Sequence, residues 1–276
     1  MNFQRMLAQA SDRQASMLCV GLDPEPARFP QPWRNDPTKI FEFCARIVDA
    51  TKDLVCAFKP QIAYFAAHRA EAQLEALMAY LRRTAPDVPV ILDAKRGDIG
   101  STAEQYAREA FVRYQADAVT LSPYMGFDSL EPYLAHDGKG LILLCRTSNP
   151  GGSDLQAQRL ASGELLYEQV ARLAAGPWHR EGRLGLVVGA TFPQELARVR
   201  ELAPTLPLLI PGVGAQGGDA AATVQAAWRP QGPIIVNSSR AVLYAGDGPD
   251  FASQARQVAR ATRDALAAAQ RRVPAA

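Results

Sequence analysis

Charged residues stand at the ends of three consecutive apolar runs in this chain. In chain order they are Asp23, Lys59, Asp93, Lys95 and Asp98. Because side chains two residues apart on a strand point the same way, Asp93 and Lys95 are expected on one side of the third run. Charges removed from water are costly unless they are paired. The pattern therefore predicts an alternating network of lysines and carboxylates. A purely structural ion-pair cluster is the alternative, but five charges on three successive runs favour a functional site.

Such a network suits chemistry at a carbon atom. A lysine among carboxylates stays charged and can act as a general acid toward a developing carbanion. A carboxylate beside an anionic group of a substrate disfavours that group's charge, and the cost is relieved if the group leaves as neutral carbon dioxide. A lysine that forms a Schiff base needs a lowered pKa in apolar or cationic surroundings. The acidic residues that accompany Lys59 and Lys95 argue against that second chemistry.

A glycine-rich segment and an arginine near the end of the chain predict a phosphate site. The seventh apolar run leads into PGVGAQGGD (211–219), where glycines let backbone N–H groups approach an anion. The eighth ends in NSSR (237–240), whose Arg240 can hold a phosphate with two parallel hydrogen bonds. The glycines also fit the G-x-G-x-x-G spacing, but no acidic residue follows at the distance that a dinucleotide's ribose requires. Tight turns are the structural alternative.

The fifth run ends in RTSNPGG (146–152). Its hydroxyl and amide groups could read the edge of a base or a carbonyl. Taken alone, the segment is better explained as a polar turn.

Eight short apolar runs must position these residues. They are rich in Val, Ile and Leu and do not alternate with polar residues, which is typical of strands buried on both faces. The runs cover residues 17–23, 54–61, 88–95, 117–123, 140–148, 184–191, 206–214 and 232–240. Amphipathic segments typical of helices lie between or after them, at 71–83, 102–114, 164–174, 193–202 and 251–270.

Strands that alternate with helices predict a parallel sheet. Eight repeats without a break in composition favour a single (β/α)8 TIM barrel over residues 1–276, with an open doubly wound sheet as the rival. A barrel would bring the charged residues together at the carboxyl ends of its strands and the phosphate site to the loops after strands 7 and 8.

Composition narrows the chemistry further. The chain has 276 residues, 48% of them hydrophobic, but only 3 His and 4 Cys, and their spacing fits neither a zinc site nor a disulfide framework. A net charge of +2 favours neither nucleic acid nor a membrane as a partner. Charges interrupt the N-terminal segment, so no secretory signal is expected. A cytoplasmic location is predicted, with catalysis by lysines, carboxylates, hydroxyls and backbone amides.

The segment DAKRGDIGSTAEQYA (93–107) resembles the signature of the orotidine 5′-monophosphate decarboxylase family. Other elements of that family occur in the same order: GLD (21–23), FKPQ (58–61), TSNPGG (147–152), PGVGAQGGD (211–219) and NSSR (237–240). The resemblance spans nearly the whole chain and is strongest to the longer bacterial branch. It implies conversion of orotidine 5′-monophosphate (OMP) to UMP and carbon dioxide without a metal or organic cofactor.

The resemblance also implies roles for individual residues. Lys95 would protonate C6, Asp93 would lie beside the substrate carboxylate, and Lys59 would hold the charge network and contact the ribose. Asp98 would reach the site of a neighbouring subunit, which implies a homodimer. The expected substrate-binding residues are Asp23, Ile99, Thr102, Ser148, Pro211, Gly212, Gln216, Asn237 and Arg240. The loop between Ser148 and Leu165 is expected to close over the phosphate.

Two other readings share some of these residues. A related sugar-phosphate decarboxylase or aldolase barrel would use the same phosphate site but needs Mg²⁺ or a Schiff-base lysine. A non-catalytic phosphate-binding barrel would need Gly212, Gln216 and Arg240 but would have no use for the Asp and Lys residues of the third run.

Overall fold

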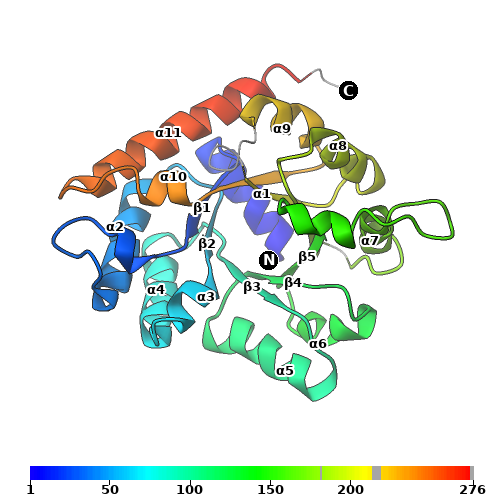
Figure 1. The fold of residues 1–276 in the computed structure, drawn as a ribbon, viewed down its shortest axis with the longest axis horizontal. Helices are drawn as coiled ribbons and strands as arrows, with labels where there is room; N and C mark the ends of the chain where they lie inside the picture. The colour runs from blue at the N-terminus through cyan, green and yellow to red at the C-terminus, as the bar shows by residue number, and fades with distance from the viewer. Residues whose placement is uncertain (181, 213–218, 274–276) are drawn as a thin grey trace.

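Eight parallel strands form a barrel surrounded by helices (Figure 1). The computed structural model describes residues 1–180, 182–212 and 219–273. The strands are β1 (Leu18–Leu22), β2 (Ala57–Pro60), β3 (Ile91–Arg96), β4 (Ala118–Leu121), β5 (Gly140–Arg146), β6 (Leu184–Val188), β7 (Leu208–Pro211) and β8 (Ile234–Ser238). Seven lie within the apolar runs and β3 extends one residue beyond its run, to Arg96, so the TIM-barrel prediction is confirmed and the open doubly wound sheet is wrong.

The order of the strands in the sheet is β2-β1-β8-β7-β6-β5-β4-β3. Single parallel bridges from Phe58 to Val90 and from Gln61 to Asp93 join the two ends of this order, β2 and β3. The first and last strands of the chain, β1 and β8, are neighbours, with Cys19 opposite Asn237. Residues from both ends of the sequence therefore meet at one barrel mouth.

Helix α1 precedes the first strand, and the other helices follow the strands around the barrel. They are α1 (Phe3–Gln14), α2 (Ile40–Thr51), α3 (Ile62–Ala66), α4 (Glu71–Thr84), α5 (Gly100–Arg108), α6 (Glu131–Leu134), α7 (Leu166–Ala175), α8 (Pro193–Leu202), α9 (Ala220–Ala227), α10 (Arg240–Leu243) and α11 (Phe251–Gln270). Short 3-10 turns lie at Pro26–Arg28, Pro37–Lys39, Phe127–Ser129 and Pro150–Asp154. The helix expected over 102–114 is α5 followed by a π-helical turn, Glu109–Arg113, rather than one regular helix. None of the helices in these described ranges is long and apolar enough to cross a membrane.

Each strand is apolar on both faces because the barrel has two cores. The inner core takes one residue from every strand, namely Cys19, Ala57, Ile91, Ala118, Ile142, Val187, Leu209 and Ile235. The outer core packs the alternate residues, such as Leu18 and Val20, against the helices. This arrangement explains why the strands do not alternate in sequence.

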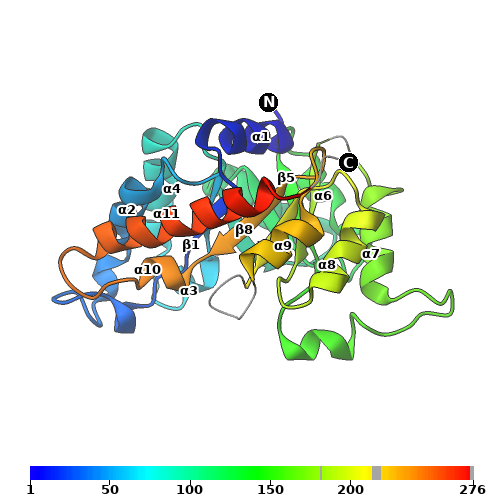
Figure 2. The same ribbon diagram turned by 90° about the horizontal axis from the view of Figure 1, so that it is seen from above.

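Helix α1 covers the end of the barrel where the strands begin. Phe3 and Leu7 of this helix belong to the inner core, and a Cβ on Gly140 would lie 2.5 Å from the ring of Phe3. Figure 2 shows α1 on the side opposite α3 and α10, which follow β2 and β8. Because α1 occupies one end, a ligand can approach the interior from the carboxyl ends of the strands.

Candidate active site

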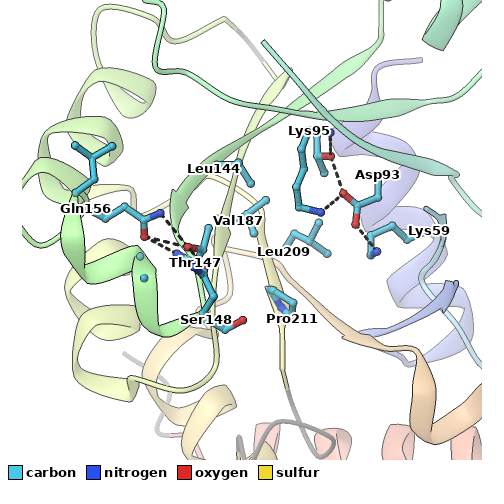
Figure 3. A pocket seen from close by; sticks show the side chains of 15 residues that line it. Lys59, Asp93, Lys95, Leu144, Thr147, Ser148, Gln156, Val187, Leu209 and Pro211 are labelled. Atoms are coloured by element: carbon cyan, nitrogen blue, oxygen red, sulfur yellow. Dashed lines mark hydrogen bonds and ion pairs between the residues drawn. The ribbon is translucent and has the colours of Figure 1, made fainter. Parts of the chain in front are cut away.

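Two cavities adjoin at the carboxyl ends of the strands. The larger one measures about 540 Å³ and the smaller about 290 Å³, and Lys59, Asp93, Lys95 and Pro211 line both. In Figure 3 the charged residues lie on one side of the larger cavity, and Thr147, Ser148 and Gln156 lie on the other, with Leu144, Val187 and Leu209 between them.

Lys59, Asp93 and Lys95 form a charged triad. Lys59 Nζ donates to Asp93 Oδ2 at 2.7 Å, and Lys95 Nζ donates to Asp93 Oδ1 at 2.6 Å. The side chains of Lys59 and Asp93 are only 6% and 9% exposed, whereas that of Lys95 is 46% exposed. Asp93 is thus held between a buried and an accessible ammonium group, and the accessible one can meet a ligand.

Lys59 and Asp93 stay ionised despite their burial. Burial alone would raise the pKa of Asp93, but Lys59 and Lys95 outweigh that effect and hold this pKa well below its ordinary value of 3.8. Burial alone would lower the pKa of Lys59, but Asp93 and Asp23 outweigh it and hold that pKa above 10.5. Both lysines are therefore supplied with a neighbouring negative charge, as a general-acid role requires and a Schiff-base role does not.

The five predicted charges do not all join one network of contacts. Asp23 acts on Lys59 through its charge. Asp98 Oδ1 accepts a hydrogen bond from the backbone N–H of Ile99, and the side chain of Ile99 is 54% exposed. Asp98, Ile99 and the exposed Thr102 are not among the residues that line the two cavities. Direct contacts thus join Lys59, Asp93 and Lys95, and they leave Asp23 and Asp98 outside.

The smaller cavity contains the predicted ribose and phosphate residues. It is lined by Asp23, Gly212, Asn237 and Arg240, among others. Asp23 Oδ1 and Asn237 Oδ1 are buried acceptors that find no hydrogen-bond donor in the part of the chain that the structure describes. Such atoms are normally satisfied, so a ligand with hydroxyl donors is the natural partner. Gln216 of the predicted phosphate site lies outside the described residues.

Several cavity residues were not predicted from the sequence. Among them are Gln61, Tyr64, Thr120, Leu144, Gln156, Val187 and Leu209. Thr120 had a signal: it is the one polar residue of the strand at 118–121, and its hydroxyl donates to Asp93 Oδ1 at 2.9 Å. The apolar residues had none, because a strand residue that lines the cavity looks like any other residue of the barrel core.

A buried arginine anchors the loop on the wall opposite the triad. Arg146, only 2% exposed, donates from Nε to Glu195 Oε2 at 2.6 Å and from Nη2 to Ser153 Oγ at 3.1 Å. Gln156 Oε1 accepts from the backbone N–H of Thr147 at 2.8 Å. These bonds tie the 3-10 turn, the residue Gln156 after it and helix α8 to the end of β5, next to Ser148. No three His, Cys, Asp or Glu side chains within residues 1–180, 182–212 and 219–273 are placed to hold a metal ion.

Comparison with known proteins places these features in one family. Residues 16–255 match the orotidine 5′-phosphate decarboxylase / HUMPS family. The chain is 76% identical to an orotidine 5′-phosphate decarboxylase of Methylibium petroleiphilum, over 98% of this chain and 100% of that one. It is 72% identical to an orotidine 5′-phosphate decarboxylase of Variovorax paradoxus, over 98% and 99% of the two chains. The solved structure of Leishmania donovani OMP decarboxylase is 40% identical and superposes with a TM-score of 0.81, over 96% of this chain and 100% of that one.

Proposed function

The chain belongs to the orotidine 5′-phosphate decarboxylase / HUMPS family and decarboxylates OMP in pyrimidine biosynthesis, and we propose that its charged triad performs this reaction with Lys95 as the proton donor. The observation that carries the proposal is the position of Lys95 Nζ, which is bonded to Asp93 at 2.6 Å and yet is on a side chain 46% exposed at the cavity. Its buried counterpart, Lys59, cannot reach a ligand as freely.

The proposed step is balanced without a further reactant. The bond between C6 and the carboxyl carbon breaks, carbon dioxide leaves, and the electron pair stays on C6. Lys95 Nζ transfers a proton to C6, giving UMP, and later regains a proton from water. Asp93 lies beside the departing carboxylate and disfavours its charge in the ground state. No organic cofactor or metal takes part in this scheme.

The rest of the cavity is proposed to bind the nucleotide. Asp23 and Asn237 accept hydrogen bonds from hydroxyl groups through their unpartnered oxygens. Ser148 bonds the pyrimidine ring from the opposite wall. The residues proposed for the phosphate and its surroundings are Pro211, Gly212, Gln216 and Arg240, with the loop between Ser148 and Leu165 closing over them. Binding at a group that does not react can supply energy for loop closure and for positioning of the reacting end.

A homodimer is proposed in which Asp98, Ile99 and Thr102 complete the site of the other subunit. It is supported by Ile99, which is 54% exposed after β3, and by Tyr124 and Met125, which are 78% and 51% exposed after the neighbouring strand β4. Large apolar side chains that are exposed on adjacent segments are typical of an interface. We also propose that residues 1–276 are a single domain and that the protein is cytoplasmic, which its four free cysteines support.

The test of the triad is the variant Lys95→Ala. Decarboxylation, followed as loss of OMP absorbance after the enzyme is dialysed against a chelator, should fall to background, while UMP binding stays measurable. Lys52→Ala, which removes an exposed lysine paired with Asp49 on α2, is the matched control and should leave turnover unchanged. Substantial turnover by Lys95→Ala would contradict its role as the proton donor.

The shared site is tested by mixing two inactive variants, Lys95→Ala and Asp98→Ala. A heterodimer of the two has one site that combines an intact lysine with an intact aspartate. Random subunit exchange at equal concentrations should therefore restore about one site in four. If activity does not return although mass measurements show that heterodimers have formed, each site is self-contained.

A further inference from the structure

Thr120 joins the two reacting members of the triad. Its side chain lies on β4, is 1% exposed, and belongs to the lining of the larger cavity. The hydroxyl donates to Asp93 Oδ1 at 2.9 Å and accepts from the backbone N–H groups of Ala94 and Lys95, both at 3.0 Å. A hydroxyl has one proton and two acceptor sites. Because two N–H groups fill its acceptor sites, its proton has to go to Asp93.

The backbone explains why this hydroxyl is needed. Strands β3 and β4 pair regularly up to Leu92 and Val119, and pairing resumes with Arg96 opposite Leu121. A regular ladder would place Ala94 opposite Leu121, so the register shifts by two residues within β3. The N–H groups of Ala94 and Lys95 lie in this irregular segment. Thr120 takes the place of the backbone acceptor that the ladder does not supply there.

The same segment is strained at the proposed proton donor. Lys95 has φ = 48°, in the left-handed region that residues other than glycine rarely occupy. Such a conformation persists only where the surrounding structure fixes it. The hydrogen bond from the N–H of Lys95 to Thr120 acts at this residue. On a regular strand, side chains two residues apart point the same way, and this shared direction alone would bring Lys95 toward Asp93.

We propose that Thr120 is a positioning residue for decarboxylation: its hydroxyl holds the irregular backbone of Lys95 and the carboxylate of Asp93 in one arrangement, so that Lys95 Nζ faces the reacting carbon. This inference rests on the proposed function of the triad. It assigns Thr120 no contact with the substrate. The hydroxyl group of Thr120 does the positioning, and its methyl group contributes only packing.

The test compares Thr120→Val with Thr120→Ser. Valine keeps the shape and removes the hydroxyl, whereas serine keeps the hydroxyl. We expect Thr120→Val to lower the single-turnover rate by about 100-fold, the loss typical of a misplacement of about 1 Å. Its Kd for UMP should stay within about threefold of the parent value, because the product does not need the proton donor to be aligned. Thr120→Ser should recover most of the rate.

The matched control is Thr51→Val. Thr51 on α2 is 0% exposed, and its hydroxyl donates to Ile47 O at 2.7 Å. It has the burial of Thr120 without a place in the cavity, so its variant should keep the parent rate even if it loses stability. If Thr120→Val does not fold, Thr120→Ala replaces it, and its single-turnover rate and its Kd for UMP are judged in the same way.

Two results would overturn the inference. One is a Thr120→Val enzyme that turns over at the parent rate. The other is a loss of UMP binding that parallels the loss of rate in both the valine and the serine variants, which would indicate general damage to the site. A failure of the proposed function is distinguishable from both. It would show as turnover by Lys95→Ala, whereas an inactive Lys95→Ala with a fully active Thr120→Val contradicts the role of Thr120 alone.

Discussion

The two lysines of the triad should contribute very differently to stability, although each is bonded to Asp93. The Lys59–Asp93 pair has side chains 6% and 9% exposed, so Lys59→Met leaves a buried carboxylate with one partner fewer. Breaking a buried pair in this way costs about 3–5 kcal/mol. Lys95 is 46% exposed, and solvent screens its pairing with Asp93. Lys95→Met should therefore cost about 1 kcal/mol or less, although it removes the proposed proton donor.

Urea unfolding at a fixed subunit concentration measures both values, together with Tm. In a chain of this size each kcal/mol lowers Tm by about 2–4 °C. Lys59→Met should therefore melt roughly 6–20 °C below the parent, and Lys95→Met only a few degrees below it. The double variant Lys59→Met/Asp93→Leu should recover part of the lost stability, because the buried carboxylate of Asp93, which lost its partner, is removed as well. Decarboxylation should be lost in all three variants.

The stability lost in Lys59→Met should depend on pH in a way that follows from the directions of the pKa shifts of Asp93 and Lys59. The pKa of Asp93 is lowered in the folded protein. Its contribution to stability is therefore present above pH 3.8 and is lost as pH falls through the pKa of the folded state. The pKa of Lys59 is raised in the folded protein. Its contribution to stability is therefore complete below pH 10.5 and is lost as pH rises through the pKa of the folded state. The gap in stability between the parent and Lys59→Met should be constant between these limits. Equal unfolding midpoints for the two proteins, or equal losses for Lys59→Met and Lys95→Met, would refute the reasoning.

Three further substitutions test other parts of the fold. Lys95→Gly should be about 1 kcal/mol more stable than Lys95→Ala in thermal melts, because glycine tolerates φ = 48°; equal stability would mean that this backbone is not strained. Arg200, 2% exposed, donates to backbone carbonyl groups around the start of β7 and β8. Arg200→Lys should lose about 3 kcal/mol in urea unfolding while keeping the parent kcat, and a loss of kcat in the folded variant would show that this end of the barrel affects the site. A Cβ on Gly21 would overlap Ser239 Oγ and lie 3.0 Å from Asn237 Oδ1. Gly21→Ala should therefore weaken UMP binding by about tenfold in titration calorimetry. Unchanged binding would remove Asn237 from the proposed site.

Much of the fold could be predicted because the signal is local and repeated. All eight strands and the helices α4, α8 and α11 were found from apolar runs and helical periodicity. Helix α1 was not predicted, although Phe3, Leu7 and Ala10 are its buried residues. Its position across the end of the barrel depends on contacts with strands far along the chain, which no local pattern records.

The sequence by itself was enough to identify the charged groups that line the two cavities. Asp and Lys residues at strand ends, glycines after β7 and Arg240 after β8 could be identified because charged and glycine residues are conspicuous after buried runs. The parallel topology accounts for the meeting of Asp23, Lys59, Asp93, Lys95, Gly212 and Arg240 at one barrel mouth. The types of residue were enough to predict a lysine that stays charged.

Only the tertiary structure decided how these groups divide the work. It buried Lys59 and left Lys95 accessible, although both end apolar runs. It left Asp98 outside the contacts of the triad, and it brought Thr120 of the next strand against Asp93. The proximity of Lys95 to Asp93 was predicted from a regular strand, but it arises in a segment with shifted register and φ = 48° at Lys95. Burial, register and backbone conformation depend on neighbours that are distant in sequence, so residue types and spacing along one chain do not contain them.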